Sequence, residues 1–336
     1  MNIKKIGLSA LAGSLAMFSA NAVELAVSGK SEITYVKKDT GSNGNPFGMG
    51  NAITFSGSGD VNGMTATYTA VLGDGGQANS NNSETFASSS LLLDMGDMGT
   101  IGFDQGVGVF GVGTIDDKTP YAYEEQWNFT GASNGLRAAG GTNALGYKNT
   151  VMGYTLSLEI DPGHSATTGG TADGSTAGAS ATDHGFNFAI TGSPAEGLSA
   201  GVGYGQEEAD GDNHQNDTDA KFYTAYANYA FGAATVGLQR SSANGGINTA
   251  TSNEVIIYGV SYAVNENLSV SYSEMENEFG TGDVVTAGAV TEDTKGIGAS
   301  YTMGSASIRV LNSKTDNLAG SSTDVKHTEV SLMLAF

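Results

Sequence analysis

The chain contains 336 residues, with 14 Lys and Arg against 35 Asp and Glu, and a formal net charge of -21 at pH 7. This acidity argues against a nucleic acid partner, because phosphates repel such a surface, and the absence of cysteine excludes disulfide cross-links. Fifty glycines without a three-residue period exclude collagen. Hydrophobic residues make up only 39%, which favours a repetitive solenoid or a barrel with a wet interior over one dry core.

The chain begins with a segment typical of exported proteins. Residues 1–22, MNIKKIGLSALAGSLAMFSANA, place Lys4 and Lys5 before an apolar run and end in a small-x-small sequence. This is the pattern of a secretory signal peptide, here cleaved after Ala22. We expect a mature protein of residues 23–336, in which no window approaches the roughly 20 apolar residues of a membrane helix.

Short segments with alternating apolar and polar residues follow one another along the whole mature chain. Such alternation predicts β-strands. The predicted strands are residues 24–38, 51–60, 64–73, 88–95, 100–105, 145–149, 154–160, 186–191, 198–206, 221–231, 234–241, 254–264, 268–275, 295–303, 306–313 and 324–336. The tally of about 16 is an even number.

The connections between these strands are alternately short and long. The short ones are residues 61–63, 96–99, those near 150, 193–197, 231–233, 264–267 and 303–305. The long, polar ones are residues 39–47, 74–83, about 106–143, 161–184, 206–219, 242–253, 276–293 and 313–324. Outer-membrane barrels have short periplasmic turns and long extracellular loops, so this alternation predicts an all-β, antiparallel transmembrane barrel.

The two faces of the predicted strands differ in the same sense. In residues 221–231, Tyr223 and Tyr229 share one face, whereas Thr224 and Asn228 share the other. In hydrocarbon every backbone polar group must be paired, so a spanning sheet has to close on itself. We therefore expect the first and last strands to pair, with the apolar face toward lipid and the hydroxyl-rich face toward water.

The same alternation places charged side chains on the water-facing side. The basic residues on that side are Lys30, Lys148 and Arg309, and the acidic ones include Glu32, Glu159 and Glu329. Arg137 lies at the end of the longest loop and can face either way. The water-facing wall is therefore expected to be mixed in charge.

Several sequence segments are spread over the mature chain, from VELAVSGKSEITYV through MGDMGTIGFDQGVGVFG and YANYAFGAATVGLQ to VSLMLAF. Together they resemble the general porins of alphaproteobacteria. The resemblance implies a 16-stranded outer-membrane barrel, a homotrimer, and a third loop that folds into the lumen as a constriction. The matching loop is residues 106–143, and it lacks the Pro, Glu, Phe and paired Gly of the enteric porin loop.

The resemblance also implies roles for individual residues. In this family acids at the constriction face bases on the barrel wall. The expected acids are Asp104, Asp116, Asp117, Glu124 and Glu125, and the expected bases are Lys30, Arg137, Lys148 and Arg309. A tail ending in Leu332, Leu334 and Phe336 resembles the signal that the barrel assembly machinery reads.

Two acidic stretches raise the question of a bound metal. Residues 207–219 hold six acids and 276–293 hold five, without a base in either. Divalent cations such as calcium could bridge these loops to one another or to lipopolysaccharide phosphates. Gln215 stands where a calcium loop needs glycine, so the alternative is a solvated acidic rim that attracts cations to the mouth. A metal site stays unknown and no other cofactor is expected.

These patterns together predict a passive channel and no enzyme. A channel for small hydrophilic solutes and ions needs a narrow water path with opposed charges, and the net acidity favours a weak cation preference. No compact acid-base constellation appears. One alternative is a substrate-specific outer-membrane channel. A more distant one is a secreted β-solenoid adhesin or surface protein, which would have repeats of near-constant length. The expected location is the outer membrane of a Gram-negative bacterium.

Overall fold

The structure is a computed structural model of the chain. It describes residues 24–39, 44–73, 86–127, 144–161, 164–165, 181–182, 185–207, 220–244, 253–279 and 290–336. The predicted signal peptide of residues 1–22, Arg137 and most of the acidic stretch 207–219 lie outside these residues. No helix in the described ranges is both long and apolar enough to cross a membrane.

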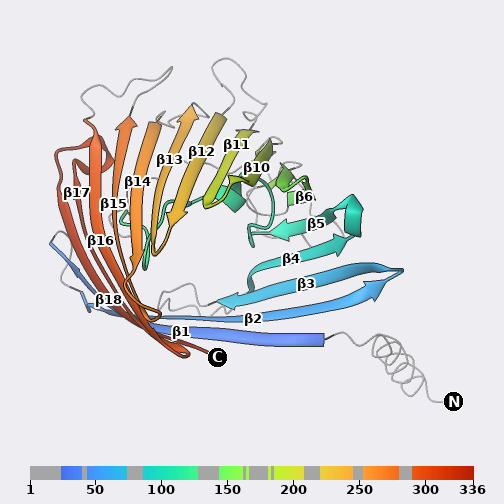
Figure 1. Cartoon of the computed structure of the whole chain (residues 1–336), viewed down its shortest axis with the longest axis horizontal. Coiled ribbons are helices and arrows are strands. Elements are labelled where there is room, and N and C mark those ends of the chain that lie inside the picture. The colour runs from blue at the N-terminus through green and yellow to red at the C-terminus, as the bar shows by residue number, and fades with distance from the viewer. Residues whose placement is uncertain are drawn as a thin grey trace.

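Sixteen antiparallel strands form a closed barrel. Figure 1 shows how these strands are arranged in space. The strands are β1 (Glu24–Lys38), β2 (Phe47–Val61), β3 (Met64–Gly73), β4 (Phe86–Asp94), β5 (Thr100–Gln105), β6 (Ala144–Val151), β7 (Tyr154–Asp161), β10 (Gly185–Ala195), β11 (Leu198–Glu207), β12 (Ala220–Phe231), β13 (Ala234–Asn244), β14 (Asn253–Ala263), β15 (Leu268–Phe279), β16 (Glu292–Met303), β17 (Ala306–Asp316) and β18 (Val325–Ala335). The predicted barrel of about 16 strands is confirmed.

Shorter elements lie in the connections. Strands β8 (His164–Ser165) and β9 (Ala181–Thr182) pair only with each other. Three 3-10 helices occur among the described residues: η1 (Gly96–Met98), η2 (Gly111–Ile115) and η3 (Leu318–Gly320). Of these, η2 lies in the long connection between β5 and β6, which matches the expected third loop.

The barrel closes where the first strand meets the last. Strand β1 pairs with β18 from Lys30 opposite Ala335 to Lys38 opposite His327, and with β2 on its other side. The C terminus accordingly lies beside β1 in Figure 1. Every strand of the barrel thus has two neighbours, which leaves no open edge with unpaired backbone groups.

The short turns have the backbone that the sequence demands. Between β2 and β3, Asn62 and Gly63 both have positive φ angles, of 55° and 82°. Two consecutive positive φ angles define the type I′ turn, for which Asn-Gly is the preferred pair. This turn matches the twist of the flanking strands and fixes their register, Val61 opposite Met64.

Side chains alternate between an exposed apolar face and a more covered polar face. In β18, Leu332 is 42% exposed and Leu334 49%, whereas Glu329 and Ser331 are 0% and 1% exposed. We call the first the outer face and the second the inner face. Exposed Tyr, Leu, Val and Ile side chains recur on the outer face around the barrel, as expected for a surface that lipid covers.

Some connections differ from the sequence-based prediction. Residues 193–197 were expected to form a turn, but β10 continues to Ala195 with a register shift between Gly192 and Ala195. Pro194 has no backbone N–H to donate, and a bulge is where a strand tolerates it. Residues 276–293 were expected to be one loop, but β15 extends to Phe279 and β16 begins at Glu292. The charged side chains at these ends of β15 and β16 do not prevent the two strands from pairing, because the ends extend beyond the apolar band of the outer face.

Candidate pore constriction

The long connection after β5 turns sharply at its first residues. Asp104, near the end of β5, is only 4% exposed. Its two carboxylate oxygens accept hydrogen bonds from the backbone N–H groups of Val107 and Val109, each at 2.7 Å. Asp104 was expected among the constriction acids; the structure places it under the loop, where it holds the loop's first turn.

The loop then follows the inner face of the barrel. The N–H of Gly111 donates to Ser157 Oγ of β7 at 2.8 Å, and the N–H of Val112 donates to Asn187 Oδ1 of β10 at 2.6 Å. Apolar packing adds to these bonds in one buried cluster, formed by Val112, Ile115, Ala189, Phe222 and Ala243. Helix η2 is therefore fixed to β7, β10 and β12 by both polar and apolar contacts.

The next residues continue along the wall to β13 and β15. Gln239 of β13 accepts from the N–H of Lys118 at 2.7 Å and donates to the carbonyl of Ile115 at 3.1 Å. The N–H of Ala122 donates to Ser271 Oγ of β15 at 2.9 Å. The backbone of a loop that lies inside the barrel is thus satisfied by side chains of the wall, as buried backbone groups require.

Glycines of the wall make room for this loop. A Cβ on Gly259 of β14 would lie 2.8 Å from the carbonyl oxygen of Pro120, and a Cβ on Gly146 of β6 would overlap the ring of Phe110. Both glycines face inward and allow the loop to pack directly on the sheet. Part of the unusual glycine content is explained by this close approach.

Through Tyr123 the loop reaches the seam of the barrel, which is the place where β1 pairs with β18. The Tyr123 hydroxyl lies 2.8 Å from Glu329 Oε1 of β18 and 3.1 Å from Glu32 Oε1 of β1. The guanidinium of Arg309 on β17 lies 4.4 Å from the Tyr123 ring centroid and forms an ion pair with Glu32. Tyr123 is 7% exposed. Three strands at the closure site therefore meet at one loop side chain.

Acidic groups gather around Tyr121 on the same loop. Burial, followed by the negative charges of Glu125, Asp117 and Glu124, raises the pKa of Tyr121 to about 12. Burial, with a contribution from the charge of Asp117, also raises the pKa of Glu125. Asp116, the remaining expected acid, is half-buried beside Asp117. Of the five expected acids, the structure brings Asp117, Glu124 and Glu125 together.

The expected basic residues have different surroundings. Arg309 is held by Glu32 and Tyr123, and Lys148 of β6 has its Nζ 5.8 Å from the centroid of Phe110. Lys30 is exposed on the inner face of β1. These three lie on the side of the sheet that the alternation assigned to them, and their roles at a constriction stay predictions.

Two residues of this site were not singled out from the sequence. Tyr123 joins groups that lie 91 and 206 residues away along the chain, so no local pattern reveals it. Lys118 is the one base between Gly106 and Trp127, and a single base in an acidic segment is the feature by which the sequence could have pointed to it.

The C-terminal residues Leu332, Leu334 and Phe336 lie on the outer face, with Phe336 73% exposed. Within the described residues no group of His, Asp and Glu could hold a metal ion.

A closed 16-stranded barrel with an exposed apolar outer face, a polar inner face and a loop docked inside defines the class of outer-membrane channel proteins. The chain belongs to the Gram-negative porin family, whose model matches residues 7–310. This family and the barrel fold assign the protein to the outer membrane and to channels, not enzymes. A search of curated proteins gave no significant sequence match.

Solved porin structures share the fold at low sequence identity. Salmonella typhi OmpF in complex with daunomycin has a TM-score of 0.69 and 14% identity, covering 94% of this chain and 98% of its own. The anion-selective porin from Comamonas acidovorans has a TM-score of 0.66 and 16% identity, covering 94% and 100%. A mutant of the Rhodopseudomonas blastica porin has a TM-score of 0.62 and 18% identity, covering 93% and 100%.

Proposed function

We propose that the protein is a passive diffusion channel for small hydrophilic solutes and ions, with a weak preference for cations. The observation that carries the proposal is the loop of residues 106–127. It packs on the inner face of β7, β10 and β12 to β15, and it reaches the seam at β1 and β18 through Tyr123. Water-filled space is then left between this loop and the strands it does not cover, whose inner faces carry Ser and Thr.

The cation preference rests on the balance of charge along this path. The loop presents Asp117, Glu124 and Glu125, and the facing Arg309 is already paired with Glu32. Negative charge near a narrow passage raises the local concentration of cations. The anion-selective relative shows that this fold also serves anions, so the sign depends on the residues of this chain.

Planar bilayers test the proposal. The detergent-purified protein should give ohmic current steps, and a KCl gradient should give a reversal potential with the sign of cation preference. An anion-selective reversal potential would reject the preference. Current that a sugar, nucleoside or organic acid blocks in a saturable way would instead support a substrate-specific channel. A protein that never conducts would overturn the channel itself.

The outer face suggests how the barrel contacts lipid. Lys295, Lys314 and Lys326 lie directly opposite one another on β16, β17 and β18, on the outer face and near the long loops. Like charges in this arrangement are unfavourable. Acids offset part of the repulsion, since Lys314 lies 2.5 Å from Asp316 and Lys295 3.5 Å from Glu274. We propose lipopolysaccharide phosphates as the remaining counter-charge, with divalent cations such as calcium bridging them to the acidic loops.

Export and assembly follow from the sequence. We propose cleavage of residues 1–22 during export and insertion by the barrel assembly machinery, which would read the tail ending in Phe336. A homotrimer is proposed from the resemblance to general porins. Current steps that appear in groups of three would support the trimer, and single steps would argue for independent barrels.

A further inference from the structure

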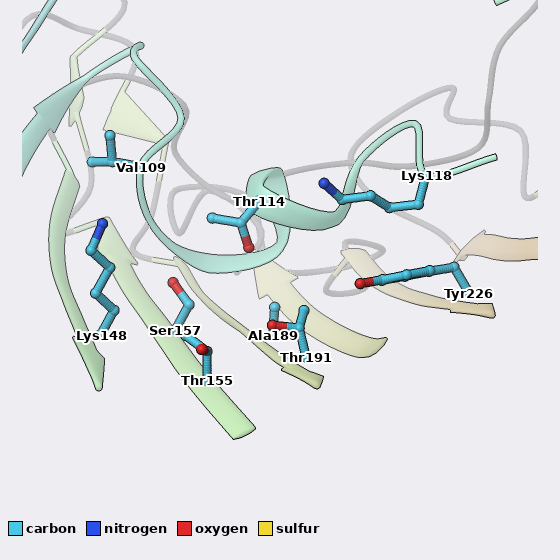
Figure 2. Close-up of a pocket in the computed structure, with 9 residues that line it drawn as sticks. All are labelled: Val109, Thr114, Lys118, Lys148, Thr155, Ser157, Ala189, Thr191 and Tyr226. Atoms are coloured by element: carbon cyan, nitrogen blue, oxygen red, sulfur yellow. The ribbon is translucent and has the colours of Figure 1, made fainter. Parts of the chain in front are cut away.

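A cavity of about 280 Å³ lies between the constriction loop and the wall of the barrel, on the side of the short turns. Figure 2 shows the residues that line it, which come from the loop and from β6, β7, β10 and β12. They are Val109, Thr114, Lys118, Lys148, Thr155, Ser157, Ala189, Thr191 and Tyr226. The volume is just below the ~300–1,000 Å³ usual for small-molecule sites, which suits a small ligand.

Two lysines and no acids line this cavity. Lys118 comes from the loop and Lys148 from β6, and none of the nine lining residues is Asp or Glu. In Figure 2 the Lys118 side chain extends over the cavity, and Lys148 stands at its other end. Neither ammonium forms an ion pair with any residue that the structure describes. This is unusual in a chain with a net charge of -21.

Asp104, near the end of β5, does not neutralise this charge by contact. Both carboxylate oxygens of Asp104 are engaged by the backbone N–H groups of Val107 and Val109. An anion in a cavity lined by two ammonium groups is attracted by both, and the attraction is stronger where protein partly replaces water.

Hydroxyl groups complete a set of donors for such an anion. Tyr226 and Thr191 line the cavity, and neither hydroxyl has a hydrogen-bond partner among the described residues. Ser157 Oγ accepts from Gly111 N–H, which leaves its own hydrogen free to donate. Thr114 differs, since its hydroxyl already donates to the Gly111 carbonyl at 2.7 Å. Ammonium and hydroxyl donors suit an oxygen-rich anion, and lysine serves as a point charge for phosphate.

We propose that this cavity is a binding subsite for a small oxyanion, the phosphate or carboxylate group of a solute, held between Lys118 and Lys148. The inference rests on the proposed channel only in that solutes must reach the cavity. The cavity lies on the side of the loop that faces the short turns, because two of its lining residues, Lys148 and Thr155, flank the turn at Met152 and Gly153. The subsite would retain anionic solutes next to a constriction that is itself acidic.

Inorganic phosphate is the probe for binding, measured by phosphorus NMR line broadening with the detergent-solubilised full chain. Lys118→Met and Lys148→Met should each weaken phosphate binding about tenfold, and the double variant should abolish it. Lys221→Met is the matched control, because it removes the same charge from the outer face of β12. Unchanged binding in the double variant, or an equal loss in the control, would overturn the subsite. Lys148→Arg keeps the charge beside Phe110 and should retain binding if Lys148→Met fails to fold.

The same variants, measured in planar bilayers, test the proposed subsite independently of the proposed channel function. Phosphate added to the bath should reduce the current of the unaltered protein in a saturable way and leave the double variant unaffected. Conductance without any response to phosphate would contradict the subsite alone. Phosphate binding without conductance would contradict the channel alone. Acetate tested in place of phosphate shows whether the cavity also binds a carboxylate group. Saturable competition between acetate and phosphate would place both anions in one site.

Discussion

Phe336 and Gly29 hold the two ends of the barrel together. The N–H of Gly29 donates to the Phe336 carbonyl at 2.7 Å, and the N–H of Phe336 donates to the Gly29 carbonyl at 2.9 Å. The Phe336 ring lies over Gly29 on the outer face, where a Cβ on the glycine would overlap it. The terminal aromatic is therefore accommodated by the absence of a side chain on the first strand.

Replacing this glycine should strain the seam. Gly29→Val forces the Phe336 ring to move or the strands to part, and overpacking of this kind costs about 1–3 kcal/mol. Urea unfolding of the detergent-refolded protein measures the loss. Gly50→Val is the matched control, because a Cβ at Gly50 meets nothing within 4 Å. Equal stability of the two variants would show that the ring contact contributes nothing to closure.

Tyr123 should hold the loop against the seam. Tyr123→Phe removes the hydroxyl that contacts Glu329 and Glu32 and leaves the buried Glu329 Oε1 without this donor, at a cost of about 1–3 kcal/mol. The single tryptophan, Trp127, reports the result, since it packs in a buried cluster with Val255, Ile257 and Met275. Its fluorescence should shift to the red as the loop loosens. Tyr258→Phe, on the outer face, should leave the emission unchanged; an identical spectrum in both variants would exclude the anchoring role.

Gly259 should determine how closely the loop approaches the wall. Gly259→Val brings a side chain onto Pro120 and should displace the loop, with a loss of about 1–3 kcal/mol in the free energy of unfolding. Trp127 emission should shift as well, because Val255 and Ile257 belong to the same strand. Gly50→Val again serves as the control. A Gly259→Val protein with unchanged stability and emission would contradict the packing of Pro120 on β14.

The acids of the loop should make ion selectivity depend on pH. The pKa of Glu125 is raised by burial and by Asp117, so this carboxylate takes up its proton at a higher pH than an ordinary glutamate. Cation preference should therefore begin to fall at a higher pH than it would if Glu125 titrated as an ordinary glutamate. Reversal potentials recorded from pH 8 downward under a KCl gradient measure the change.

Glu125→Gln removes this titration and also has a predictable effect on stability. A raised pKa means that the folded state binds the proton more tightly than the unfolded state, so Glu125 destabilises the fold at neutral pH and less so as the pH falls. The variant should be more stable than the parent at pH 7 and lose that advantage in acid. Glu196→Gln, in an exposed turn, is the control. A selectivity curve that the Glu125→Gln variant leaves unchanged would rule out Glu125 as its source.

Local patterns were sufficient to predict most of the barrel. Strands β3 and β5 have the bounds that alternation predicts, residues 64–73 and 100–105, because a polar turn interrupts the two-residue period at one end or both. Strand β2 starts earlier than expected, at Phe47, because glycines at 48 and 50 concealed the alternation. The Phe47 ring packs against Tyr35 of β1 with centroids 5.3 Å apart, a contact that only the register between the strands defines.

The site depended on contacts that local sequence does not specify. Alternation assigned Arg309 and Glu32 to the same face, but their ion pair joins residues 277 positions apart across the seam. Asp104 was expected among the pore acids because it is a charged inward residue, and that role stays a prediction. Its hydrogen bonds to the loop's own backbone could not be predicted, because they depend on the path of the chain after β5.

The central claim is that the outer face contacts lipid while the inner face lines water. The chain has no cysteine, so single cysteines can be placed on successive residues of β3. In liposomes, a charged, membrane-impermeant thiol reagent should label Thr67→Cys and Thr69→Cys and reduce the conductance. It should leave Ala66→Cys and Tyr68→Cys unlabelled, as Tyr68 belongs to the exposed apolar face. Labelling without alternation, or confined to the Tyr68 face, would contradict the account.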